Sequence, residues 1–409
     1  MLSSVSQKTS LYLDFFSRPL PQTALFGYDQ SFNSPPLPSN PSPLGANASA
    51  ALDREPRILL VSMYLPLEKS KHSQGDYSYW QSKFLGSITT PVYFYTTPSL
   101  EPGVLSSRGS LPIHVNTSFT SAFEVPPLQG LQDRYRKMQK LDRETWGHNA
   151  DLYAVWNAKL WLLDNAVQQL KREGEEYDYV FWNDAGSFRW DHPYTRWPDP
   201  KRVDEVWQAG LEQARAAGNM TARKEDILFF PLTGTYDWLR RYWREDDGPV
   251  DAEISEGSFF GGSPETMSWW TKVFYAYHDY WLQRGLFVGK DQTIFNSLFL
   301  LFPSRVIGVW ISDPATNIGL PPRFDTGPLG ACGNPWHYYQ YFLASQEEQR
   351  VMRQRWMTDL EARVEWPWKG WKWWLKRQEC RVTRVVWVQD MVNDAFGKGW
   401  GVRKTLQIP

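Results

Sequence analysis

An acidic residue, Asp184, stands where an apolar run of the sequence stops, and it could bind a cation. The run Tyr177–Trp182 has the composition of a buried strand, and Asn183, Asp184 and the small pair Ala185-Gly186 follow it directly. In open parallel sheets, ligands bind outside the carboxyl ends of strands, where a carboxylate can hold a hard divalent cation that also binds phosphate oxygens. Small neighbours leave room for a bulky diphosphate. The alternative is that Asp184 only begins a turn.

Lys159 makes a second chemical demand, because it falls inside the apolar stripe of a predicted helix, between the directions of Val155 and Leu163. A buried ammonium is costly unless it is paired, so this position predicts a carboxylate, a carbonyl or an anionic ligand close by. The alternative is that the aliphatic stem packs and the amine reaches out to solvent.

Two predicted helix starts carry further candidates. Gly261 and Gly262 precede one helix, and paired glycines let backbone approach a ligand at a helix end that favours anions. They could equally serve only to turn the chain. Lys290, Asp291 and Gln292 open another helix. Asp291 could be a catalytic carboxylate or bind an acceptor hydroxyl, although a plain N-cap is the more ordinary role for Asp.

Other chemistries find little support in the sequence. The six histidines show no ligand pair at helical or hairpin spacing, and the two cysteines, Cys332 and Cys380, allow one disulfide but no metal motif. Neither a G-x-S-x-G elbow nor a P-loop occurs. With 44 basic and 45 acidic residues, the chain lacks the basic excess that nucleic-acid binding demands.

Strand-like and helix-like segments alternate along the chain, which predicts an α/β fold with mostly parallel strands. Asn149 is expected to cap the longest helix and Ser263 the helix after the glycine pair. The expected strands are 58–61, 92–95, 113–115, 177–182, 227–230, 258–260 and 306–311, and the expected helices are 77–88, 150–172, 263–285 and one that follows 291.

Composition divides the chain into three parts. Residues 1–55 are rich in Ser, Pro and Asn and are expected to form a disordered arm, and 56–345 are expected to form the main domain. Residues 346–409 are expected to be a helical, Trp-rich extension. Its Trp/Lys stretch at 366–374 could touch a membrane surface, but a packed clasp is favoured because Pro367 and Gly370 break any long amphipathic helix.

The compartment is weakly indicated. Three Asn-x-Ser/Thr sequons, at Asn47, Asn116 and Asn219, fit the secretory pathway. No signal-peptide layout and no apolar run long enough to cross a bilayer is visible. Most of the 23 tryptophans are expected in the core, although indole faces also suit sugar rings.

The order of four motifs resembles the HtrL/YibB family of glycosyltransferase-like proteins over about residues 57–312. The motifs are Leu152–Lys159, Val180–Arg189, Phe259–Ser263 and Lys290–Asn296. The resemblance implies a GT-A fold, with a Rossmann-type sheet flanked by helices, a nucleotide-sugar donor and a divalent cation, Mn²⁺ or Mg²⁺. Where many GT-A enzymes have Asp-x-Asp, this chain reads Asp184-Ala185-Gly186. The second carboxylate is therefore missing.

We therefore expect transfer of a hexosyl group from a UDP-sugar to a hydroxyl of a glycan or glycoconjugate. Asp184 is expected to hold the metal, and Asp291 and Gln292 to serve the catalytic step, with inversion and retention of configuration both open. The residues expected to line the donor are Tyr64, Lys159, Asn183, Arg189, Gly261 and Gly262.

Two other functions compete with this expectation. The incomplete acidic motif fits a non-catalytic carbohydrate- or protein-binding module that kept the fold, because a fold does not guarantee a function. A pyrophosphorylase-like enzyme would need a Gly-rich basic loop near the first strand, and the sequence shows none there.

Overall fold

The computed structural model describes residues 54–67, 72–316, 334, 336–363, 382 and 384–408. By its internal contacts the chain divides into two units, Met1–Arg54 and Glu55–Pro409. The elements below belong to the second unit. Nearly all of the predicted arm at 1–55, both cysteines, the Asn47 sequon and the Trp/Lys stretch at 366–374 lie outside the described residues.

Eight strands of the described residues form one sheet, in the order β3-β2-β1-β4-β6-β5-β7-β8. Strands β3, β2, β1 and β4 are mutually parallel, and so are β5 and β7. Strand β6 is antiparallel to β4 and β5, and β8 is antiparallel to β7. The strands are β1 Ile58–Tyr64, β2 Val92–Thr96, β3 Ile113–Asn116, β4 Tyr179–Asn183, β5 Leu228–Leu232, β6 Phe259–Gly262, β7 Val306–Trp310 and β8 Val386–Trp387.

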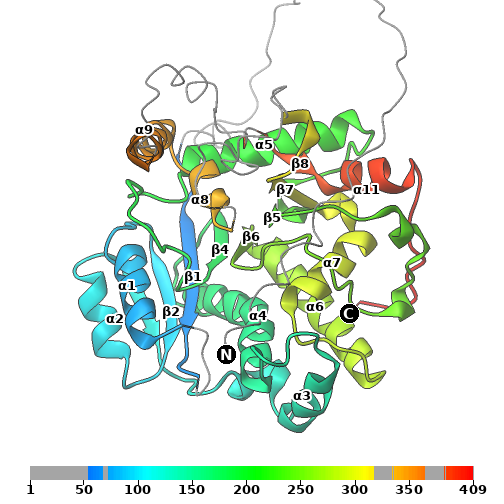
Figure 1. The fold of residues 1–409 in the computed structure, drawn as a ribbon, viewed down its shortest axis with the longest axis horizontal. Helices are drawn as coiled ribbons and strands as arrows, with labels where there is room; N and C mark the ends of the chain where they lie inside the picture. The colour runs from blue at the N-terminus through cyan, green and yellow to red at the C-terminus, as the bar shows by residue number, and fades with distance from the viewer. Residues whose placement is uncertain are drawn as a thin grey trace, which may run out of the picture. The chain divides into compact units, whose positions relative to one another are not determined.

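Helices cover both faces of this sheet (Figure 1). One face packs against α1 Gln74–Leu85, α2 Glu101–Arg108, α5 Pro200–Ala216, α8 Tyr338–Phe342 and α9 Gln346–Arg363. The other packs against α3 Gln132–Met138, α4 Ala150–Arg172, α6 Pro264–Gln283, α7 Asp291–Leu301 and α11 Val388–Phe396. The predicted α/β class, a mostly parallel sheet flanked by helices, is confirmed.

Local signals fix the main helices. The side chains of Asn149 and Ser263 accept hydrogen bonds from the first turns of α4 and α6, as predicted. Helix α1 begins earlier than expected because Ser73 caps it in a reciprocal capping box with Asp76. The sequence prediction missed α2, α3, α5, α8 and β8. Helix α5 begins with Asp199 as its cap and proline at its first position, a recognisable start signal.

The reversed direction of β6 shapes one edge of the sheet. Strands β1, β4, β5 and β7 all run the same way, so their carboxyl ends share an edge. Because β6 runs against them, the segment Ser255–Ser258 before it returns to that same edge. The carboxyl edge is therefore built from strand ends and from this segment.

Gly261 lets β6 lie close against β4. It pairs with Phe181, and a Cβ at this position would lie 2.2 Å from the Val180 carbonyl oxygen. No side chain fits at that distance, so the strand pair requires glycine here.

We expect Gly261→Ala to destabilise the fold by about 2 kcal/mol or more, because the clash is with backbone that cannot rotate away. Gly103→Ala is the matched control, since a Cβ in α2 at that position meets nothing within 4 Å. It should be neutral or stabilising by up to about 1 kcal/mol. Urea unfolding of both variants tests this, and equal midpoints would contradict the argument.

Candidate active site

Asp184 lies at the carboxyl end of β4 and is partly open to solvent. Its backbone N–H donates to the Ser258 carbonyl at 2.8 Å, which ties it to the segment before β6. The Trp182 indole donates to Asp184 Oδ1 at 2.6 Å, and the carboxylate remains 36% exposed. The interpretation of Asp184 as a residue at the ligand-binding edge is therefore compatible with its position.

Lys159 is buried and paired, so the alternative in which its amine reaches solvent is wrong. The residue is 4% exposed, and its Nζ lies 2.8 Å from the Gly257 carbonyl oxygen. The same Nζ lies 3.2 Å from Asp184 Oδ1 and 3.2 Å from Asp291 Oδ2. Burial alone would lower the pKa of Lys159, but the two carboxylates outweigh it and raise the pKa. The ammonium therefore stays charged.

Asp291 is the first residue of α7 and is not the N-cap, which is Lys290. Its side chain points inward and is 3% exposed as a residue. Oδ1 accepts from the Gln292 N–H at 2.9 Å, while Oδ2 pairs with Lys159 without hydrogen-bond alignment. Burial raises the pKa of Asp291, and the Lys159 charge opposes that rise.

The first turn of α7 lies close to the segment before β6, and Gln292 and Gly257 make this approach possible. The Gln292 amide donates to the Ser255 carbonyl at 2.7 Å. A Cβ on Gly257 would lie 3.0 Å from Gln292 Cγ and 3.2 Å from Asp291 Oδ2. The absence of a side chain at Gly257 thus allows the first turn of α7 to approach Lys159. We call Lys159, Asp184 and Asp291 the Lys159 cluster.

Glu256 lies beside this cluster and was missed by the sequence analysis. It is 7% exposed and its Oε1 accepts from the Ser258 N–H at 3.1 Å. Burial raises its pKa to about 7, with Asp184 adding to the rise and Lys159 opposing it. Nothing in the sequence separates this glutamate from the exposed ones, because its burial follows from the return of β6.

Tyr64 and Arg189 meet in an aromatic group at the same edge. The Tyr64 and Tyr77 rings lie 4.9 Å apart, and Tyr77 packs against Trp80 at 5.3 Å. The Arg189 guanidinium lies 4.4 Å from the centre of the Trp80 ring and donates to the Gly186 carbonyl. A Cβ on Gly186 would lie 3.1 Å from the Tyr77 ring and 3.1 Å from the Trp80 ring. This aromatic group therefore directly adjoins the turn after Asp184. Tyr77 and Trp80 had been assigned only to a helix.

Three of the expected donor residues belong neither to the Lys159 cluster nor to the aromatic group around Tyr64. Asn183 is fully buried, accepts from the Ser187 hydroxyl and donates to the Asp184 carbonyl, so it shapes the turn. Gly261 and Gly262 lie inside β6. Their contacts with β4, Ile227 and Thr266 explain the absence of side chains there.

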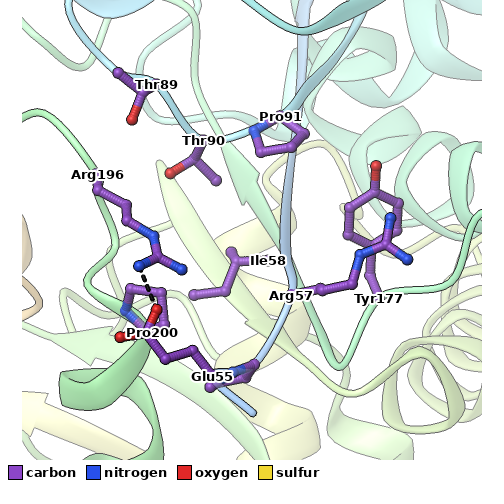
Figure 2. Close-up of a pocket in the computed structure, with 10 residues that line it drawn as sticks. Glu55, Arg57, Ile58, Thr89, Thr90, Pro91, Tyr177, Arg196 and Pro200 are labelled. Atoms are coloured by element: carbon purple, nitrogen blue, oxygen red, sulfur yellow. Dashed lines mark hydrogen bonds and ion pairs between the residues drawn. The ribbon is translucent and has the colours of Figure 1, made fainter.

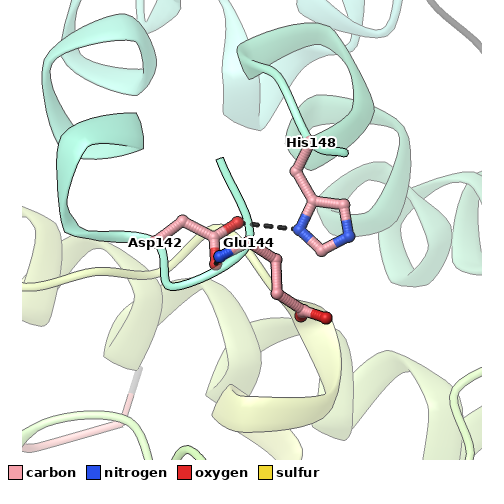
Figure 3. A group of neighbouring side chains, drawn as sticks. All are labelled: Asp142, Glu144 and His148. Atoms are coloured by element: carbon pink, nitrogen blue, oxygen red, sulfur yellow. Dashed lines mark hydrogen bonds and ion pairs between the residues drawn. The ribbon is translucent and has the colours of Figure 1, made fainter. Parts of the chain in front are cut away.

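A second group of chemically active side chains forms before α4. Asp142, Glu144 and His148 bring their ligand atoms within 4.8 Å of one another, so the group could hold a metal ion (Figure 3). The sequence search had missed it because the three residues belong to an irregular segment. His148 Nδ1 lies 2.8 Å from Asp142 Oδ2. The ammonium of Lys290 pairs with Glu144 and lies 4.0 Å from Asp142. A cationic side chain therefore already neutralises part of the charge of these carboxylates.

A pocket of about 210 Å³ lies at the opposite edge of the sheet (Figure 2). Ile58, Pro91 and Tyr177 in its lining stand at the amino ends of β1, β2 and β4. The Arg57 guanidinium lies over the Tyr177 ring, and Arg196 pairs with Glu55. Because none of the candidate residues lines it, the pocket is separate from the Lys159 cluster.

Comparison with known proteins shows a distant likeness to a solved structure. No family model matches the chain, and no curated protein matches it in sequence. Among solved structures, mouse xyloside xylosyltransferase 1 in its apo form is similar, with 11% identity and a TM-score of 0.34. The match covers 61% of this chain and 83% of that one. Among the described helices, none is long and apolar enough to cross a membrane.

We expect Lys159→Met to destabilise the fold by about 3–5 kcal/mol, because two carboxylates lose the cation that faces them in the interior. Lys171→Met, on the exposed last turn of the same helix, is the control and should change stability by less than about 0.5 kcal/mol. Chemical unfolding at pH 7 measures both. A loss below about 1 kcal/mol for Lys159→Met would contradict the buried pairing.

The raised pKa of Glu256 predicts that the stability of the fold depends on pH. Between the ordinary value of 4.5 and about 7, the folded chain keeps a proton that the unfolded chain has released, so stability falls as pH rises through that window. Glu256→Gln removes this loss. Relative to the wild type, the free energy of unfolding of the variant should rise between pH 4.5 and pH 8, by at most about 3 kcal/mol. Urea midpoints across this range test the prediction, and parallel profiles would refute it.

Proposed function

We propose that the chain transfers a hexosyl group from a UDP-sugar to a hydroxyl of a glycan or glycoconjugate. The observation that carries the proposal is the Lys159 cluster at the carboxyl edge of the sheet. A buried ammonium there holds one carboxylate inward and leaves another, Asp184, partly open at the place where ligands of such sheets bind. The aromatic group of Tyr64, Tyr77 and Trp80 stands beside it.

Each element of the site has a task in this proposal. The aromatic faces near Tyr64 suit a nucleobase. Arg189 beside Trp80 supplies positive charge close to Asp184 for the diphosphate. The exposed carboxylate of Asp184 is a fitting ligand for Mn²⁺ or Mg²⁺, since such ions are often held by one or two carboxylates together with substrate phosphates. When bound, the cation would neutralise negative charge on the departing nucleotide.

The burial of Asp291 supports a structural role for it within the proposed site. A base must come within hydrogen-bond distance of the acceptor hydroxyl. Asp291 is 3% exposed and faces Lys159, which supports a role in holding Lys159 and Asp184 in place. Gln292 would act with it by fixing the segment before β6.

The sequons support a setting in the secretory pathway.

The second candidate is a carbohydrate-binding module without turnover. Lys159 neutralises part of the charge of Asp184, and the motif lacks a second exposed carboxylate. Both features weaken a cation site and favour this alternative.

We expect UDP release from a panel of UDP-hexoses with Mn²⁺ present, and a loss of about 100-fold or more in Asp184→Asn, because the variant loses the carboxylate that would hold the cation. Asp133→Asn is the matched control, because Asp133 is an exposed aspartate on α3 and should leave turnover unchanged. Equal background in the wild type and Asp184→Asn would reject the enzyme and favour the binding module.

A further inference from the structure

Two of the three sequons, at Asn116 and Asn219, lie within the described residues, and their asparagines have different surroundings. A sequon is compatible with an N-linked glycan only where the amide nitrogen of the asparagine has room for a bulky sugar at the surface. The contacts of the two amide groups therefore show which position the folded chain can carry in glycosylated form.

Asn116 is the last residue of β3, and neighbouring side chains occupy its amide group. Its Nδ2 donates to the Tyr93 hydroxyl at 2.9 Å and to Gln169 Oε1 at 3.5 Å. The Tyr93 hydroxyl in turn donates to Gln169 Oε1 at 2.6 Å. On the other side of the amide, Oδ1 accepts from the Ser118 N–H at 2.9 Å. A sugar on Nδ2 would have to displace this half-buried group, so the fold disfavours a glycan here.

Asn219 lies instead in the turn that follows α5. Gly218 has a φ of 95°, which turns the chain out of the helix, and the Asn219 N–H donates to the Ala214 carbonyl at 2.9 Å. A Cβ on Gly218 would meet nothing within 4 Å, and Met220 is 73% exposed. The backbone of this turn is thus fixed by the helix end, while its side chains face open space.

The side chain of Asn219 keeps its amide nitrogen available. The Thr221 hydroxyl donates to Asn219 Oδ1 at 3.3 Å, so the two polar groups of the sequon face each other. In the described part of the chain, no hydrogen bond uses the Nδ2 of Asn219. The turn leads through η4 Lys224–Asp226 to the amino end of β5, the edge opposite the Lys159 cluster. A glycan at this position would leave the candidate active site open.

We propose that Asn219 carries an N-linked glycan and that Asn116 does not. In this reaction the Asn219 Nδ2 bonds to the anomeric carbon of an oligosaccharide held on a polyprenyl diphosphate. The anomeric C–O bond breaks, the polyprenyl diphosphate departs with the electron pair, and the nitrogen gives one proton to a base of the transferring enzyme. The proposal rests on the proposed function only for the secretory setting, and it does not depend on UDP-sugar turnover.

The test reads each sequon on its own peptide. The full chain, with its own N-terminus, is produced in a eukaryotic host, and trypsin separates residues 216–223 from residues 109–134. Peptide N-glycosidase in ¹⁸O-water then converts a glycosylated asparagine to ¹⁸O-labelled aspartate, which mass spectrometry detects. We expect this label on the peptide that holds Asn219 and none on the peptide that holds Asn116.

Variants of Thr221 are matched, because only one of them removes the sequon. Thr221→Val lacks the hydroxyl and should lose the label at Asn219, whereas Thr221→Ser keeps the sequon and should retain it. Urea unfolding checks the surroundings of each asparagine. Asn219→Gln should unfold at the wild-type midpoint, and Asn116→Gln should unfold at a lower urea concentration because it loses its fitted contacts with Tyr93 and Gln169.

An unlabelled Asn219 in the wild type, a labelled Asn116, or a label that persists in Thr221→Val would overturn the proposal. UDP release is measured on the same preparation. UDP release without a glycan at Asn219 rejects only this proposal, and a glycan at Asn219 without UDP release rejects only the enzyme.

Discussion

The ammonium of Lys159 is the interaction on which the arrangement of this edge depends. It is buried in α4 and is shared among the carboxylates of Asp184 and Asp291 and the carbonyl of Gly257. A charge taken out of water is tolerated only when its partners are held in good geometry. Three elements besides α4 therefore have to meet at one point: the end of β4, the segment before β6 and the start of α7.

The reversal of β6 makes that meeting possible. In a fully parallel sheet the segment before a strand lies at the amino edge, far from the strand ends. Here β6 runs against β4 and β5, so Gly257 and Glu256 return to the carboxyl edge. Gly261 permits the close approach of β6 to β4. The topology of the sheet thus sets the composition of the site.

The charge balance of the site follows from these contacts. Asp184, Asp291 and Glu256 are three acids around one ammonium, and Glu256 relieves the excess by keeping its proton up to about pH 7. The acid that remains open to solvent is Asp184. The positive charge of Arg189 lies just beyond it, over Trp80. The edge therefore alternates acidic, basic and aromatic groups within a short distance.

The sequence by itself determined the local elements, because caps and apolar periodicity act over a few residues. It predicted the bounds of α4, the caps Asn149 and Ser263, the positions of β1 to β7 and the need of Lys159 for a partner. Only the tertiary structure decided which groups meet that need, because strand order brings together residues far apart in the chain. Glu256, Trp80 and the group of Asp142, Glu144 and His148 carry no local signal, since their surroundings come from distant segments.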